Sequence, residues 1–271
     1  MESLYDELKT KAIKIRRNIV NMIYLASSGH PGGALSLTDI LTVLYFTEMR
    51  IDPINPKDEN RDRFVLSKGH ASAALYATLA ERGFIKNEDL LGFRNIDSML
   101  QGHPDMNKIS GVDMTTGSLG QGLSAANGMA LAGKLDKKDY RVYCALGDGE
   151  IQEGQVWEAA MTASHYKLDN LCVIVDNNNL QIDGTVDKVM SPYPIVDKFK
   201  SFGFNVIEID GHDFKQIIAA FEEAKKVKEK PTAIVAKTIK GKGVSYMENQ
   251  ASWHGKAPNE QELTQAMQDL I

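Results

Sequence analysis

The sequence contains few cysteines: only Cys144 and Cys172 occur among 271 residues. Each lies in a short apolar run that is typical of a buried strand, so we interpret both as free thiols of the core. Two cysteines are too few for a disulfide framework, and their surroundings do not indicate a zinc site.

Long apolar runs and dense positive charge are also missing. No hydrophobic stretch reaches the roughly 20 residues that a membrane-spanning helix needs. The N-terminal segment is amphipathic and carries acidic residues, unlike a signal or transit peptide, so we expect a cytoplasmic protein that does not enter a membrane. The net charge is −5 and no block of lysine and arginine stands out, which argues against nucleic-acid binding.

The residues that are present follow the pattern of an α/β protein. Short runs rich in Val, Ile and Ala alternate with segments of helical periodicity; the runs are residues 63–67, 141–146, 171–176, 205–210 and 232–238. Continuously apolar strands are typical of a parallel sheet that is covered on both faces. We therefore predict a doubly wound, mostly parallel sheet with helices on both faces, as a single domain over residues 1–271.

Helix ends are predicted from capping residues. The first helix should end at the glycine-rich turn 28–33, and Ser36 should cap a second helix that runs to about Met49. Asp213 should cap a helix that runs to about Lys228. Residues 95–118 show little periodicity, and a loop of this length is usually functional or mobile.

Polar motifs follow three of the predicted strands. They are GDGE (147–150), DNNN (176–179) and DGHD (210–213). Ligands of such sheets bind outside the carboxyl ends of the strands. GDG alone is a weak signal, but an asparagine cluster about thirty residues later strengthens it. A carboxylate and amides at neighbouring strand ends provide the hard oxygen ligands that Mg²⁺ prefers, and glycines let backbone amides approach a phosphate.

This pair of motifs resembles the diphosphate-binding signature of thiamine-diphosphate enzymes, which runs from GDG to NN across two adjacent strands. The resemblance implies that Asp148, Asn178 and the backbone carbonyl of Leu180 bind Mg²⁺ (or Ca²⁺ or Mn²⁺), which bridges both phosphates of thiamine diphosphate. Gly149 would contact the diphosphate. The IDG sequence at 182–184 is a further match to transketolases in particular.

Other segments along almost the whole chain are similar to the N-terminal domain of transketolases. They are SSGHPGG, LSKGHAS, QGHPD, TTGSLGQG and SWHGKAP, at residues 27–33, 66–72, 101–105, 115–122 and 252–258. The resemblance implies that His70 and His254 lie by the diphosphate, that Gly117 and Leu119 lie beside the aminopyrimidine, and that His30 and His103 line the substrate channel. We interpret the two remaining histidines, His165 and His212, as ordinary surface or core residues.

The reaction catalysed by this family explains why several histidines would be present. A transketolase moves a two-carbon ketol unit from a ketose phosphate to an aldose phosphate, and the thiazolium carbon of its cofactor is the nucleophile. Proton transfer at neutral pH suits imidazole, so we expect His30, His103 and His254 to be catalytic. A histidine at position 103 favours a ketose donor, since keto acids lack the hydroxyl that it would contact.

Two further features have alternative interpretations. Glu153 and Glu158 open a predicted helix, where carboxylates are favoured by the helix dipole; by resemblance they would instead lie at a subunit interface and link two active sites. The lysines of KTIKGKG (237–243) form either a solvated loop or an active-site loop that closes over substrate.

Parts of a complete transketolase are missing from the sequence. By resemblance, the glutamate that activates the aminopyrimidine belongs to a separate pyrimidine-binding domain, and most sugar-phosphate contacts also lie there. We expect a complete gene product that acts with a second chain carrying the pyrimidine-binding and C-terminal domains, as an α2β2 heterotetramer. The alternatives are a non-catalytic transketolase-like subunit and a split thiamine-diphosphate enzyme that uses pyruvate. We set aside a nicotinamide dehydrogenase, because no GxGxxG joins a strand to a helix.

Overall fold

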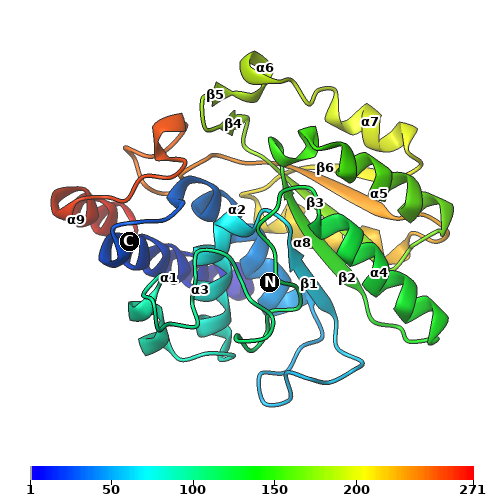
Figure 1. The fold of residues 1–271 in the computed structure, drawn as a ribbon, viewed down its shortest axis with the longest axis horizontal. Coiled ribbons are helices and arrows are strands. Elements are labelled where there is room, and N and C mark those ends of the chain that lie inside the picture. Colours follow the sequence, from blue (N-terminus) through cyan, green and yellow to red (C-terminus); the bar gives the residue numbers. More distant parts are fainter. Residues whose placement is uncertain (1) are drawn as a thin grey trace.

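A computed structural model describes residues 2–271 and centres on a five-stranded parallel sheet (Figure 1). The strand order is β1-β2-β3-β7-β6. The strands are β1 (Arg63–Leu66), β2 (Val142–Gly147), β3 (Leu171–Asn177), β6 (Asn205–Asp210) and β7 (Thr232–Lys237). Every neighbouring pair is parallel, so the predicted doubly wound parallel sheet is confirmed.

Successive side chains of the strands point into two hydrophobic cores, one on each face of the sheet. The first core includes residues of α1 (Glu2–Ala26), α2 (Pro31–Val43), α3 (Ser72–Arg82), α8 (Phe214–Lys226) and α9 (Glu260–Asp269). The second includes residues of α4 (Gly122–Leu135), α5 (Gly154–His165) and α7 (Ile195–Ser201). Cys172 belongs to the first core and Cys144 to the second, so these buried free thiols lie on opposite faces.

The start of the second helix was predicted wrongly. Helix α2 begins at Pro31, and Ser36 lies inside it. Proline suits the first helical position because its φ is already helical and its missing N–H would have no partner there. The Ser36 hydroxyl is buried and donates to Asp176 Oδ2 at 2.6 Å, so it ties α2 to the sheet instead of capping a helix. A π-helical turn (Leu44–Glu48) continues α2 almost to the predicted end.

Other predictions of local structure are confirmed. The Asp213 side chain accepts hydrogen bonds from the backbone N–H groups of Lys215 and Gln216, and it caps α8. Residues 95–118 contain neither helix nor strand. Among residues 2–271 no helix is long and apolar enough to cross a membrane.

Several short elements were not predicted. A hairpin of β4 (Leu180–Gln181) and β5 (Gly184–Thr185) and the single turn α6 (Val186–Val189) project beyond the carboxyl end of β3 (Figure 1). Short 3₁₀ turns occupy Gly69–Ala71, Asn87–Gly92, Glu150–Gln152 and Ala251–Trp253. Elements of two to six residues are too short to show a periodicity in the sequence.

Candidate active site

The polar motifs meet at the carboxyl edge of the sheet. Gly147 at the end of β2 pairs with Asp176 of β3, and Asp176 pairs with Ala236 of β7. Asp148 and Asn178 therefore follow neighbouring strands at the same edge of the sheet. This is the edge at which ligands of such sheets are expected to bind.

Asp148 is a buried carboxylate whose contacts are all backbone amides. Its oxygens accept hydrogen bonds from the N–H groups of Gly149, at 2.8 Å, and Asn179. Its exposed fraction is 2%. Burial and the neighbouring Asp176 carboxylate raise the pKa of Asp148 to about 7. No ion pair within residues 2–271 reaches this carboxylate, so a bound cation would relieve an unfavourable charge.

The other two predicted metal ligands lie in the turn that follows β3. Asn178 is buried, and its Oδ1 accepts a hydrogen bond from the backbone N–H of Leu180 at 3.2 Å. Asn179 adopts a left-handed φ of 62°, a conformation that asparagine tolerates better than most residues. The Leu180 carbonyl accepts a hydrogen bond from Lys240 Nζ at 2.9 Å.

These oxygens fit the expected donor set for a hard divalent cation. One carboxylate, one amide and one carbonyl would leave further positions for phosphate oxygens and water. Within residues 2–271 no three His, Cys, Asp or Glu side chains gather as a metal site, and the expected set does not need such a group. The ligand roles of Asp148, Asn178 and Leu180 stay a prediction.

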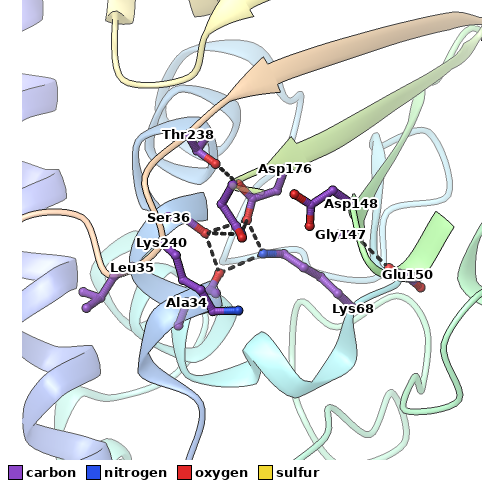
Figure 2. Close-up of polar contacts among 12 residues, drawn as sticks. Ala34, Leu35, Ser36, Lys68, Gly147, Asp148, Glu150, Asp176, Thr238 and Lys240 are labelled. Carbon is purple, nitrogen blue, oxygen red and sulfur yellow. Dashed lines mark hydrogen bonds and ion pairs between the residues drawn. The ribbon is translucent and has the colours of Figure 1, made fainter. Parts of the chain in front are cut away.

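A buried ion pair beside Asp148 was missed in the sequence. Lys68 Nζ lies 2.5 Å from Asp176 Oδ2, with side-chain exposed fractions of 2% and 0% (Figure 2). Ser36 and Thr238 also donate to the Asp176 carboxylate. Burial acts to raise the pKa of Asp176, but Lys68 and the hydrogen bonds from Ser36 and Thr238 together hold the pKa of this carboxyl below its usual value. Lys68 directly precedes the Gly69-His70 pair of the LSKGH motif, which is the signal that could have identified it.

Lys68 also joins the sheet to the start of α2. Its ammonium group donates to the Gly33 carbonyl at 2.8 Å as well as to Asp176. Because α2 begins directly after His30, this contact fixes the position of His30 relative to the polar edge of the sheet.

Three of the predicted histidines form a cluster. The ring centroids of His30, His70 and His254 lie 5.2 to 5.4 Å apart. Burial, reinforced by nearby cationic groups, lowers the pKa of His30 to about 4, that of His254 to about 3 and that of His70 well below its usual value. All three rings are therefore neutral at pH 7.

His103 and Arg94 extend this cluster. Burial and then the Arg94 guanidinium lower the pKa of His103. Arg94 Nη2 lies 3.4 Å from His30 Nδ1, and it was not singled out in the sequence. A Cβ atom on Gly117 would lie 3.4 Å from the His103 ring, so the loop holding the predicted aminopyrimidine contacts lies against the predicted substrate channel. Leu119, in the same loop, is 38% exposed.

Glu150, a residue that was not predicted, joins three segments of this site. Its carboxylate accepts hydrogen bonds from Ser67 Oγ at 2.5 Å, Gly120 N at 2.9 Å and Gly147 N at 3.0 Å. The side chain is buried, and burial raises its pKa. Glu150 therefore connects the ends of β1 and β2 to the loop that carries Gly117 and Leu119.

The two glutamates predicted at an interface are exposed. Glu153 directly precedes α5 without capping it through its side chain, and Glu158 lies within α5. Neither forms an ion pair within residues 2–271. Their interface role stays a prediction.

The two histidines interpreted as ordinary residues differ from each other. His165 is exposed in the last turn of α5. His212 is partly buried; its Nδ1 lies 2.7 Å from Asp39 Oδ2, and its Nε2 accepts from the Ile239 N–H at 2.8 Å. His212 is therefore a satisfied internal residue that anchors the chain next to Lys240.

The carboxyl edge of this doubly wound parallel sheet carries glycine turns, buried oxygen donors and neutral histidines. This arrangement is typical of α/β proteins that bind a small molecule at that edge. The chain belongs to the transketolase family: the family described as "Transketolase, thiamine diphosphate binding domain" matches residues 8–270.

Similar proteins fall into two groups by length. One chain of an apulose-4-phosphate transketolase from Phocaeicola vulgatus, itself named as a subunit, is 45% identical over 98% of this chain and 94% of its own length. A 6-deoxy-6-sulfo-D-fructose transketolase subunit from a Clostridium species is 44% identical over 97% of this chain and 96% of its own length. Human transketolase is 46% identical over 97% of this chain, which spans 42% of the human protein.

Solved structures show the same relation. The transketolase of Campylobacter jejuni superposes with a TM-score of 0.92 at 39% identity, over 97% of this chain and 42% of that chain. The transketolase of Leishmania mexicana gives 0.92 at 33% identity. The fold of this chain is thus that of a segment of these longer enzymes.

Proposed function

We propose that this chain is the thiamine-diphosphate-binding subunit of a two-chain transketolase, which transfers a two-carbon ketol unit from a ketose phosphate to an aldose phosphate. The observation that carries the proposal is the placement of the Asp148, Asn178 and Leu180 oxygens at the same sheet edge as a cluster of neutral histidines. Two relatives that match over nearly their whole length are named as transketolase subunits, which supports a second chain. Their names specify different sugars.

The residues that would hold the cofactor lie on neighbouring loops. Asp148, Asn178 and the Leu180 carbonyl would bind Mg²⁺, with Gly149, His70 and His254 beside the diphosphate. Gly117 and Leu119 would contact the aminopyrimidine. When bound, the cofactor supplies a thiazolium carbon that acts as nucleophile and electron sink.

The histidines would move protons and orient the sugar. His254 Nδ1 lies 2.9 Å from Lys240 Nζ, and an ammonium group can only donate, so Nδ1 accepts and Nε2 carries the ring proton. His254 can therefore donate from Nε2 to a sugar oxygen. Neutral His30 and His103 can each donate to or accept from hydroxyl groups of a ketose, which is the work that ketol transfer requires of the protein.

The second chain would supply the pyrimidine-binding and C-terminal domains in an α2β2 assembly, and residues 1–271 would form one diphosphate-binding domain. The exposed side chains of Leu119, Glu153 and Glu158 support a contact surface near the site. A cytoplasmic location is part of the proposal, since both cysteines are free and buried.

Ketol transfer measured with and without a partner chain tests this function. We expect activity from ketose phosphates only when thiamine diphosphate, Mg²⁺ and a chain with a pyrimidine-binding domain are all added. Asp148→Asn in the same complex should reduce this activity strongly. Activity of the single chain would contradict the partner requirement, and a preference for pyruvate as donor would contradict the transketolase assignment.

A further inference from the structure

Lys240 contacts the backbone carbonyl of Leu180, which is the oxygen that the motif assigns to the metal. Its Nζ donates to the Leu180 carbonyl at 2.9 Å and to His254 Nδ1 at 2.9 Å. The residue is 2% exposed. Burial and the neighbouring Lys68 lower the pKa of Lys240 to about 8, while Asp148 and Asp176 act in the opposite direction, so the ammonium form still predominates at pH 7.

The surrounding chain holds Lys240 in this position. A Cβ atom on Gly32 would lie 2.9 Å from Cγ and Cε of Lys240, so the lysine side chain passes where any other residue would place a side chain. The next residue, Gly241, donates its N–H to the Gly32 carbonyl at 3.0 Å and adopts a φ of 79°. The ammonium group is therefore placed by a tight contact with α2.

We propose that Lys240 and the divalent cation compete for the carbonyl oxygen of Leu180, so that tight metal binding depends on the diphosphate. An ammonium at this carbonyl lies beside any metal bound to the same oxygen, and like charges at such a distance repel strongly in a buried site. A diphosphate group brings several anionic oxygens. Lys240 can then donate to one of these oxygens while the metal takes the Leu180 carbonyl.

This inference rests on the proposed metal ligands and adds a property of the site. The divalent cation and the diphosphate would each favour binding of the other by the same factor, because coupling between two binding equilibria is reciprocal. Lys240 would thereby prevent the chain from holding a metal ion without the cofactor. His254 would respond as well, since Nδ1 loses its donor when Lys240 turns toward the diphosphate.

Mn²⁺ binding to the full chain, followed by electron paramagnetic resonance with and without inorganic pyrophosphate, tests this competition. We expect Lys240→Met to tighten binding of Mn²⁺ alone by about tenfold, within the usual range of such couplings. The factor by which pyrophosphate improves Mn²⁺ binding should fall accordingly. Lys240→Arg keeps the charge and should bind Mn²⁺ as weakly as the unaltered chain.

Lys242→Met is the matched control, because it removes a charge from the same loop. Lys242 pairs with Glu248 at 3.5 Å and does not contact Leu180, so its loss should leave Mn²⁺ binding unchanged. If Lys240→Met fails to fold, Lys240→Gln removes the charge while retaining a donor. Unchanged Mn²⁺ binding in the uncharged variants, or equal tightening in Lys240→Arg, would overturn the proposal.

Asp148→Asn separates this inference from the proposed metal site. If Asp148→Asn binds Mn²⁺ in the presence of pyrophosphate as tightly as the unaltered chain, the ligand set is wrong and the competition falls with it. If Asp148→Asn binds weakly but Lys240→Met matches the unaltered chain, only the competition is wrong.

Discussion

Single residues at this site have charge states that follow from burial. His30 and His254 are kept neutral because water is partly excluded and because Arg94 and Lys240 are close. A neutral imidazole offers one donor and one acceptor, which is what a sugar with several hydroxyl groups needs. The sequence indicated that these histidines belong to one site, but their protonation depends on neighbours that lie far away in the chain.

We expect the histidine cluster to make the isolated chain less stable as the pH falls below about 6.5. A histidine whose folded pKa is depressed stabilises the fold above its unfolded pKa, and this contribution is lost as pH falls toward the folded pKa. For His30 the window runs from its ordinary value of 6.5 down to about 4. His30→Gln should therefore flatten the dependence of the free energy of unfolding on pH in this window, as measured by urea unfolding.

The size of this effect should be modest, since His30 is only partly buried and water screens its charge. His165→Gln provides the control, because His165 is exposed on α5 and lies outside the cluster. An equal change of slope in both variants would contradict the explanation.

Helices and strands were predicted correctly where their sequence pattern extends over many residues. The strands were predicted from their apolar runs, and the cap of α8 was predicted from Asp213. The proximity of Asp148 and Asn178 was predicted because both follow parallel strands, whose carboxyl ends lie at one edge of the sheet. Helix α2 begins six residues earlier than expected, since Pro31 starts it and Ser36 is used to bind Asp176. The contacts of Lys68, Glu150 and Lys240 could not be predicted, because each joins segments far apart in the sequence.

Glu150 is the residue through which the segments of the site are joined, and its replacement tests that arrangement. In Glu150→Gln one carboxylate oxygen becomes an NH₂ group, so at least one of the three donors (Ser67, Gly120 or Gly147) loses its acceptor. A buried donor without a partner costs about 1–3 kcal/mol. We expect the free energy of unfolding of the isolated chain to fall by that amount in urea titrations.

Amide exchange would locate the loss. The N–H groups of Gly120 and Gly147 should exchange faster in Glu150→Gln, whereas those in α8 should keep their rates. Glu153→Gln serves as the control because Glu153 is exposed and its side chain makes no cap; its stability should change by less than about 0.5 kcal/mol. Equal losses in both variants would show that Glu150 has no special role.

At the scale of the whole molecule, the two faces of the sheet differ in their surfaces. Helices α4 and α5 lie side by side over one core (Figure 1). A pocket between them is lined by Ser124, Gly128 and Glu158, among other residues. Helix α8 covers the opposite core. The proposed second chain should contact the face formed by α4 and α5, since Gly120 and Leu119 lie directly before α4 and would bring the cofactor to that surface.

Charge reversal on the two faces distinguishes them. Glu158→Arg should weaken association with a pyrimidine-binding chain by about 30-fold or more, as expected when one partner of a buried polar contact is changed. Glu223→Arg on α8 also reverses an exposed glutamate but should leave association unchanged. Sedimentation of the mixed chains measures the assembly, and thermal melting of each single chain checks that neither substitution unfolds the domain. If both variants assemble equally well, the α4–α5 face is not the interface, and the exposed glutamates Glu153 and Glu158 belong to a solvated surface.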